Sequence, residues 1–521
     1  MNELSITESN DRSGYEDLPY PSYTFPQTSP DRLSTMGILH GMTPPDPANC
    51  RYIELGCGNG TNVAAMASMF PQGDFVGIDL SQTHINSAKK LAAEISIENA
   101  EFIVKNILDI DVDSLGQFDY IVAHGLFSWI PEIVRTKVLE LIKACLAPNG
   151  VAYISYNALP GCYVRQIGWD LMQLRTSKIA NIEDKITSAI DVLSLVGKES
   201  VEGSLSKGLY KTLISNVSTT NRANVFHDDL TPGNKPFYFL DFVELIRRYG
   251  MKFVCEAEPE SLSENSISKT AKLELDKIAS DPLEREQYID FIDFAQFRMS
   301  IICRADIELS SSPDPAQLTK LYARSSLSAK VDDELICSAD RVNFVDVDGR
   351  SMAVNHPLTK VALQKLGSSN PESIRINELM AQSEGFLRSN GVKMEGEDVD
   401  RTLQFFLDLY VARLLSLFAN EPVVANAPGE KPQVLAFNRW QAANGCECIT
   451  SRLGENVGMS SDLVRATITM LDGTHDRKTL AKDLLTKMNI PESDFAEAES
   501  QLPAVIDKNL SRFAELGLLV Q

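Results

Sequence analysis

The chain has 521 residues, of which 44 % are hydrophobic, and this is enough to build several hydrophobic cores in roughly three or four domains. Its 71 acidic and 49 basic residues give a formal net charge of −22, which repels phosphate backbones and argues against nucleic acid as a partner. The nine cysteines form no CxxC pair, and Cys446 and Cys448 have no further ligands nearby, so we expect no metal centre.

The first residues of the chain contain neither the basic nor the apolar region of a signal peptide. No apolar run reaches the roughly 18 residues that a membrane-spanning helix needs. We therefore expect a protein of a reducing compartment, the cytoplasm, without a membrane span.

Residues 1–45 are expected to form an N-terminal arm. Residues 1–14 are polar, whereas residues 15–33 hold four prolines among aromatic side chains. This composition disfavours both helix and strand, yet it is too aromatic for a simple linker. The aromatic side chains need a surface to bury against, so the pattern predicts an extended segment that packs over another part of the protein.

From Arg51 the sequence alternates between strand and helix patterns. Strands are predicted at 51–55, 74–81, 100–107, 118–125 and 151–157, and helices at 62–70, 82–96 and 131–150. Repeated βα units of this kind predict a parallel, doubly wound sheet in an α/β fold. The ligand site of such a sheet lies at the carboxyl ends of its strands.

The alternation stops after residue 157. Residues 162–232 have apolar residues at helical spacing and are predicted to form a helical insertion. A helix at 239–250 and strands at 251–258 and 296–307 follow. We expect these two late strands to lie beyond the fifth strand and to complete a seven-stranded sheet, so that residues 46–305 form one core.

Residues 306–420 are predicted to form a separate middle domain. It contains a hairpin candidate at 341–357 that turns at Asp348-Gly349. Residues 421–433 have the composition of a linker, and residues 434–521 are mostly helical, with Thr474 as a predicted helix cap.

The stretch "YIELGCGNGTN" joins the first strand to the following helix. Its glycines Gly56, Gly58 and Gly60 have GxGxG spacing, and Glu54 precedes the first of them by two residues. Dinucleotide sites read GxGxxG and hold a pyrophosphate, whereas an acid this close to the turn suits a cationic ligand. S-adenosylmethionine is cationic and carries no phosphate, and bare glycine backbone can lie against it. The alternative is a structural glycine turn in an α/β fold that binds no nucleotide.

Two further pairs of residues follow the next strands. Asp79 and Leu80 end the second strand, and an acid there is placed to accept both ribose hydroxyls. Asn106 and Ile107 end the third strand and are predicted to meet the adenine amino group and ring face. The ordered combination of these pairs with the glycine turn predicts an S-adenosylmethionine site.

Residues 15–305 resemble bacterial protein-lysine methyltransferases that carry a methyltransferase regulatory domain, a family that includes rickettsial enzymes acting on an outer-membrane protein. The motifs that carry the resemblance are "YEDLPYPSYTFPQTSPDRL", "IELGCGNGTN", "FVGIDLS", "FDYIVAHGLFSWIP", "AYISYNALPG" and "VFHDDLTPGNKPFYFLDFVELIRRYGMKFVCEAE". The resemblance implies a class I methyltransferase core, a regulatory region at about 225–305 and a winged-helix-like domain at 434–521. One departure is Ser29, which stands where the family pattern has His before Pro.

Methyl transfer from a sulfonium requires a neutral nucleophile about 3 Å from the methyl carbon, with little water present. The transfer residues are expected after the fourth and fifth strands. We predict that Tyr156 and Asn157 orient the amine and that Trp129, together with Phe127, forms an aromatic wall. His124 is predicted to contact the cofactor or to relay a proton. Packing in the core is the alternative role for each of them.

The arm is predicted to close over the bound cofactor, with Tyr20, Gln27 and Thr28 lining the closed site. The sequence therefore favours an S-adenosylmethionine-dependent methyltransferase that acts on lysine side chains of a protein substrate. A small-molecule methyltransferase and a non-catalytic, cofactor-sensing interaction protein are the alternatives. A homodimer is left open.

Overall fold

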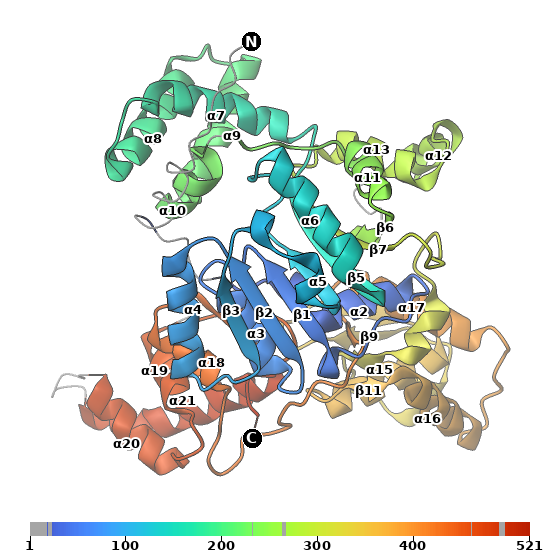
Figure 1. The fold of residues 1–521 in the computed structure, drawn as a ribbon. Coiled ribbons are helices and arrows are strands. Elements are labelled where there is room, and N and C mark those ends of the chain that lie inside the picture. The colour runs from blue at the N-terminus through green and yellow to red at the C-terminus, as the bar shows by residue number, and fades with distance from the viewer. Residues whose placement is uncertain are drawn as a thin grey trace.

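The computed structural model describes residues 18, 23–231, 233–262, 267–459, 461–488 and 495–520. A seven-stranded sheet occupies the centre of the molecule, with a helical insertion above it and the later domains below it (Figure 1). None of the helices in this described part combines the length and hydropathy that a membrane crossing demands. Tyr20, which was predicted to line the cofactor site, lies outside the described residues.

The central sheet has the strand order β3-β2-β1-β4-β5-β7-β6. The first five strands are parallel, and β7 is antiparallel to both β5 and β6. The predicted seven-stranded sheet is thus confirmed, with the two late strands beyond the fifth. The strands are β1 (Arg51–Leu55), β2 (Asp74–Asp79), β3 (Ala100–Val104), β4 (Phe118–Ala123), β5 (Leu146–Asn157), β6 (Met251–Glu256) and β7 (Phe297–Arg304).

Helices cover both faces of this sheet (Figure 1). The helices of the arm and of the core are η1 (Pro26–Thr28), α2 (Pro30–Leu39), η2 (Pro47–Asn49), α3 (Thr61–Met69), α4 (Gln82–Glu94), η3 (Ile107–Asp109), α5 (Val112–Leu115), α6 (Glu132–Cys145), α11 (Phe239–Arg248), η5 (Pro259–Leu262), α12 (Lys269–Ile278) and α13 (Pro282–Asp293). The helix predicted at 131–150 ends earlier, at Cys145, because Pro148 disfavours helical backbone at the residue before it and Leu146 already pairs with Phe118 of β4.

Successive side chains of a strand point to opposite faces, and this divides β5 between two hydrophobic cores. Tyr153 packs with α2 and α3 residues on one face, whereas Ile154 and Tyr156 pack with α6 and α11 residues on the other. The first of these cores continues without a break into the middle domain. The middle domain is therefore packed directly against the sheet.

The insertion and the regions that follow consist mainly of helices and short strands. The helical prediction for 162–232 is confirmed by α7 (Cys162–Thr176), α8 (Ile182–Glu199), α9 (Leu205–Thr219), α10 (Arg222–Asn224) and η4 (Val225–Asp229). The middle domain has η6 (Pro315–Lys320), β8 (Tyr322–Arg324), α14 (Asp333–Cys337), β9 (Val342–Val345), β10 (Ser351–Val354), α15 (Pro357–Ser369), β11 (Ile374–Arg375), α16 (Ile376–Ser389), α17 (Asp398–Val411) and β12 (Ser416–Phe418). Strands β9 and β10 form the predicted hairpin.

The described residues of the C-terminal domain form four helices and one hairpin. Its elements are α18 (Ala436–Ala443), β13 (Cys448–Thr450), β14 (Asn456–Gly458), α19 (Asp462–Met470), α20 (Arg477–Lys487) and α21 (Phe495–Glu515). The prediction of Thr474 as a helix cap is wrong: Asp476 caps α20 by accepting from two backbone N–H groups, and Thr474 instead donates to Asp472.

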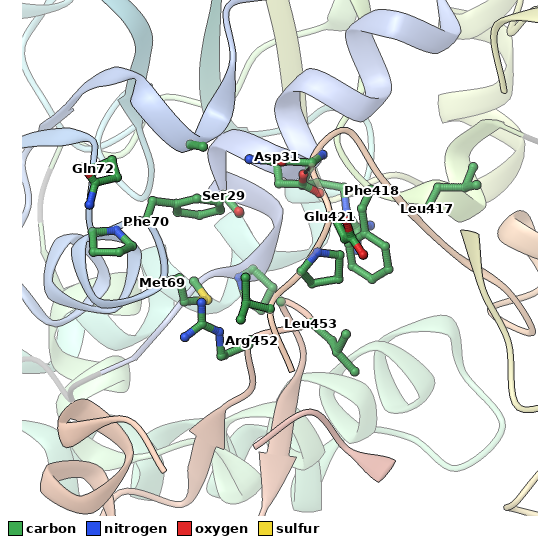
Figure 2. Close-up of a pocket in the computed structure, with 18 residues that line it drawn as sticks. Ser29, Asp31, Met69, Phe70, Gln72, Leu417, Phe418, Glu421, Arg452 and Leu453 are labelled. Carbon is green, nitrogen blue, oxygen red and sulfur yellow. Dashed lines mark hydrogen bonds between the residues drawn. The ribbon is translucent and has the colours of Figure 1, made fainter. Parts of the chain in front are cut away.

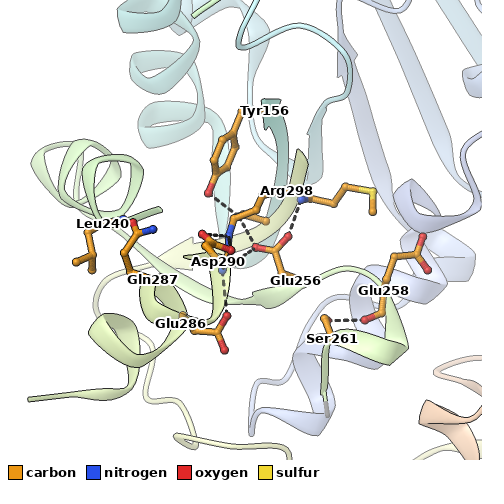
Figure 3. Close-up of polar contacts among 11 residues, drawn as sticks. Tyr156, Leu240, Glu256, Glu258, Ser261, Glu286, Gln287, Asp290 and Arg298 are labelled. Atoms are coloured by element: carbon orange, nitrogen blue, oxygen red, sulfur yellow. Dashed lines mark hydrogen bonds and ion pairs between the residues drawn. The ribbon is translucent and has the colours of Figure 1, made fainter. Parts of the chain in front are cut away.

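A buried arginine joins the two late strands to the helices beside them (Figure 3). Arg298 of β7 donates to Glu256 of β6 at 2.9 Å and to Asp290 of α13 at 2.8 Å, and it also reaches Glu286 at 3.1 Å. Only 6 % of its side chain is exposed. Its guanidinium also lies over the ring of Phe239 in α11. This one cation therefore compensates the negative charge of several carboxylates, two of which, Glu256 and Asp290, are largely buried.

We predict that Arg298→Met destabilises the core by about 3–5 kcal/mol, because it leaves the charges of Glu256 and Asp290 buried without a cation to compensate them. Urea unfolding followed by fluorescence measures this change. Arg388→Met is the matched control, since Arg388 pairs only with Glu384 on an exposed helix face. A loss of less than 1 kcal/mol in Arg298→Met would show that the cluster is not required for stability.

Candidate active site

Three of the five residues in the turn between β1 and α3 are glycines with left-handed backbone. Gly56, Gly58 and Gly60 have φ values of 77°, 55° and 74°. A Cβ on Gly60 would lie 2.5 Å from the Cβ of Ala88, so this glycine is required by helix packing. A Cβ on Gly58 would meet nothing within 4 Å. Gly58 therefore presents bare backbone to open space, as a ligand-binding turn requires.

Asp79 holds this turn from the end of the neighbouring strand. Its Oδ2 accepts from the N–H of Gly58 at 2.9 Å, and its Oδ1 accepts from the N–H of Ser81 at 2.9 Å. A carboxylate can accept about four hydrogen bonds, so lone pairs remain for the hydroxyls of a ligand. Leu80, the next residue, is exposed.

The end of β3 lies beside the end of β2, as expected for adjacent parallel strands, with Lys105 N–H donating to Asp79 C=O. Asn106 caps the short helix η3, and its side chain accepts from the N–H of Leu108 at 3.0 Å. Ile107 is half-buried at the start of η3. The structure thus brings both members of this predicted pair to the same edge as Asp79.

Glu54 lies beneath the turn and is only 3 % exposed. Its Oε2 accepts from Asn62 Nδ2 at 2.9 Å. Burial raises the pKa of Glu54 to about 7, and the nearby charge of Asp79 adds to this effect. A cation bound next to Glu54 would favour its ionised form, so the site is prepared for a positively charged ligand.

The N-terminal arm is joined to the turn through the same asparagine. Asn62 Nδ2 also donates to Thr28 Oγ1 at 2.9 Å, and Asn62 Oδ1 accepts from the N–H of Phe25 at 2.8 Å. The side-chain amide of Gln27 donates instead to the sulfur of Met299 in β7. Ser29, the departure from the family pattern, is buried and caps α2 with no side-chain hydrogen bond to that helix.

The arm also contacts the residue that follows β4. The ring of Phe25 lies 3.9 Å, centroid to centroid, from the imidazole of His124. His124 Nδ1 is 2.9 Å from the hydroxyl of Tyr153. Burial lowers the pKa of His124 to about 4, so the imidazole is neutral at physiological pH.

Asn157 ends β5 and is fully buried. Its backbone N–H donates to Ser128 Oγ at 2.8 Å, and its Nδ2 donates to Asn234 Oδ1 at 2.9 Å. Its Oδ1 has no hydrogen-bond partner among the described residues, and the same holds for Trp129 Nε1 and Asn234 Nδ2. Buried polar atoms are nearly always paired, so unpaired atoms on three neighbouring segments indicate a place for a polar ligand group.

Tyr156 is not brought together with Asn157 and His124. Because side chains alternate along β5, its ring points to the opposite face of the sheet, where it stacks on Phe242 at 4.2 Å. Its hydroxyl lies 3.3 Å from Ser300 Oγ, beside the Arg298 cluster. Phe127 is likewise fully buried on that face. The amine-orienting role predicted for Tyr156 thus has no counterpart in this geometry.

Sequence reasoning missed the residues that hold the arm. Asn62 was assigned only to a helix, although a polar residue in the first helical turn after the last glycine is a usable signal. The hairpin of the C-terminal domain also contributes: Thr24 Oγ1 lies 2.6 Å from Thr450 Oγ1 and 2.7 Å from Asn456 Oδ1. No local sequence pattern predicts a contact between two residues that are more than 400 positions apart.

Comparison with known proteins assigns three parts of the chain to described families. Residues 46–210 match a methyltransferase domain, residues 221–304 a predicted methyltransferase regulatory domain, and residues 430–518 a PKMT C-terminal winged helix domain. The uncharacterized protein RP789 of Rickettsia prowazekii is 27 % identical over 98 % of this chain and 94 % of its own length. A second protein of that organism, RP028, is 32 % identical over 48 % of this chain and its entire length.

Among solved structures, PKMT2 from Rickettsia typhi in complex with AdoHcy superposes with a TM-score of 0.82 at 26 % sequence identity. The match covers 96 % of this chain and 100 % of PKMT2. The residues at the glycine turn fit the same cofactor, since the open side of Gly58 and the buried acid Glu54 suit a cationic ligand without phosphate. The chain therefore belongs to the bacterial methyltransferase family that joins a methyltransferase regulatory domain to a PKMT winged helix domain, and its cofactor is S-adenosylmethionine.

Proposed function

We propose that this methyltransferase transfers methyl groups to lysine side chains of a protein substrate. The observation that carries the proposal is the match to PKMT2 over nearly the full length of both chains, which extends to the PKMT winged helix domain. The net charge of −22 supports it, because an acidic protein attracts basic, lysine-bearing segments. We further infer that the enzyme works in the cytoplasm, with protein rather than nucleic acid as its partner.

We assign cofactor binding to the residues of the turn and of the neighbouring strand ends. Gly56, Gly58 and Gly60 supply the bare backbone, Asp79 accepts the ribose hydroxyls, and Glu54 balances the positive charge of the ligand. Leu80, Asn106 and Ile107 surround the adenine. Gln27 and Thr28 of the arm close the site over this group and exclude water.

The cofactor supplies an electrophilic methyl group when bound, and the protein has to present a neutral amine to it. We assign this task to Asn157, whose unpaired Oδ1 accepts a hydrogen bond from the amine nitrogen and so directs its lone pair. His124 is half-buried and neutral at physiological pH, so it adds no positive charge that would repel the amine. The indole of Trp129 borders the same group, and its low-dielectric surroundings favour the unprotonated lysine.

A small-molecule substrate is the second candidate, and one observation favours it. Trans-aconitate 2-methyltransferase of Variovorax paradoxus is 29 % identical to this chain, but over 110 residues that cover only 21 % of it. A match this short reaches no further than the domain that binds the cofactor. It leaves the insertion, the middle domain and the C-terminal domain without a role.

A side chain at the central glycine of the turn should weaken cofactor binding, whereas one at a glycine outside the turn should not. Gly58→Ala is expected to weaken S-adenosylmethionine binding by about 1–3 kcal/mol, because the new methyl group enters the space left for the ligand. Gly250→Ala is the matched control, since Gly250 also has a positive φ with nothing near its Cβ position and lies outside the turn. Isothermal titration calorimetry measures both affinities, and equal affinities in the two variants would contradict the assignment.

Cofactor binding should depend on pH through Glu54. The pKa of about 7 in the free protein must fall when a cation binds beside the carboxylate, so affinity rises as pH increases through 7. We expect binding to be roughly tenfold weaker at pH 6 than at pH 7.5. Glu54→Gln should flatten this dependence, whereas His124, with a pKa of about 4, does not titrate in this range. If cofactor affinity depends on pH as strongly in Glu54→Gln as in the wild type, Glu54 is not the cause of this dependence.

The proposed function is tested by finding which molecules receive the methyl group. The enzyme is incubated with S-adenosylmethionine labelled in the methyl group and a bacterial lysate separated into protein and small molecules. We expect label in the protein fraction, recovered as methyl-lysine after acid hydrolysis. Label confined to small molecules would establish the second candidate, and no release of S-adenosylhomocysteine with either fraction would contradict turnover.

In the same assay Asn157→Ala should lower kcat about 100-fold while cofactor affinity stays within twofold of the wild-type value. Asn86→Ala, a change on the exposed face of α4, is the control and should leave both quantities unchanged. The affinity measurement shows that the variant is folded. A wild-type kcat in Asn157→Ala would remove this residue from the mechanism.

A further inference from the structure

A second cavity lies apart from the glycine turn, where four parts of the chain meet (Figure 2). Its volume is about 180 Å³. Pro26 and Ser29 of the arm form one part of its wall, and residues 69–72, at the far end of α3 from the glycine turn, form another. Residues 417, 418 and 420–423 of the middle domain and linker and residues 452–454 of the C-terminal domain form most of the rest.

Arg452 contributes a cation to this cavity that has no anionic partner. Its backbone N–H donates to Gly517 C=O, but its guanidinium makes no hydrogen bond or ion pair with any residue that the structure describes. The side chain is partly buried, and burial lowers the pKa of the guanidinium. A partly buried charge without a partner is costly, so the site lacks a group that would compensate it.

The other charged groups on the wall do not compensate Arg452. Asp31 accepts from the backbone N–H of Asn420 at 2.8 Å, and burial raises its pKa to about 7, so much of its charge is lost near neutrality. Glu421 is exposed at the rim. Arg32 lies over the ring of Tyr410, 5.9 Å from its centroid.

The remaining lining is mostly apolar and comes from Met69, Phe70, Phe418, Val423 and Leu453 (Figure 2). An engineered protein cavity of about 150 Å³ is large enough to bind benzene, so this one has room for a ligand with a single ring or a short branched chain. One cation within an apolar wall is matched by a ligand with one negative charge and an apolar body. A guanidinium pairs best with a carboxylate, because two parallel N–H···O bonds form.

We propose that this cavity is a regulatory site for a small organic monocarboxylate with an apolar body, bound through Arg452. The ligand would hold Pro26 and Ser29 against the core, on either side of Gln27 and Thr28. Thr28 is bonded to Asn62 beside the buried Glu54. Occupancy of the cavity therefore favours the closed arm and, by linkage, tighter cofactor binding.

Benzoate is a suitable probe, and benzamide is its neutral counterpart of nearly the same shape. Thermal unfolding of the full chain is followed with up to 20 mM of each compound. Benzoate should raise the Tm by at least about 2 °C, benzamide should not, and Arg452→Met should abolish the benzoate effect. Arg388→Met, on an exposed helix face, should respond to benzoate like the wild type.

The proposal fails if benzoate and benzamide shift the Tm equally, if neither shifts it, or if Arg452→Met keeps the benzoate response. A second measurement tests the link to the arm: 20 mM benzoate should tighten S-adenosylhomocysteine binding at least threefold in the wild type and not in Arg452→Met. Binding of benzoate without this change would overturn the regulatory role. Neither readout depends on the methylated substrate, so the outcome is independent of the lysine assignment.

Discussion

The amide of Asn62 is the contact on which the geometry of the active site depends. It donates to Glu54 of β1 and to Thr28 of the arm and accepts from the backbone of Phe25 in the arm, so one side chain of α3 holds two other segments. With the arm in place Glu54 is buried, and this burial is what raises its pKa to about 7. The arm therefore influences the charge of the cofactor site as well as its shape, although it precedes in the sequence all the strands that form the rest of the site.

The alternation of side chains along the sheet explains how one strand serves two purposes. Tyr153 and Asn157 of β5 face the arm and the end of β4, whereas Tyr156 faces the Arg298 cluster on the other side. The cluster fixes the late strands β6 and β7 against β5, and β7 in turn provides Met299, which Gln27 of the arm contacts. The residues to which we assign methyl transfer and the Arg298 cluster thus lie on opposite faces of the same strand.

Local patterns predicted much of this structure because they reflect local physics. The glycine turn, the acid at the end of β2 and the two late strands follow from backbone conformation and periodicity, and the two late strands lie beyond the fifth as expected. The position of Asn62 in the first turn of α3 marks it as a candidate, but its partners in the arm were not predictable, since a single asparagine does not reveal distant contacts. The face of the sheet to which Tyr156 points is set by the register of β5, which the sequence alone does not give. The contact of Thr24 with Thr450 depends on how whole domains pack together. The lack of an anionic partner for Arg452 can be recognised only from the structure, which shows the neighbours of this side chain.

The central claim is that the arm is a working part of the cofactor site. Hydrogen–deuterium exchange of the full-length protein tests it most directly, through the backbone amides of residues 24–29 and 56–62 with and without S-adenosylmethionine. The account predicts that both segments become protected together, because Asn62 couples them. Protection confined to residues 56–62, with unchanged exchange in the arm, would contradict it and would leave the arm as a packed extension without a role in binding.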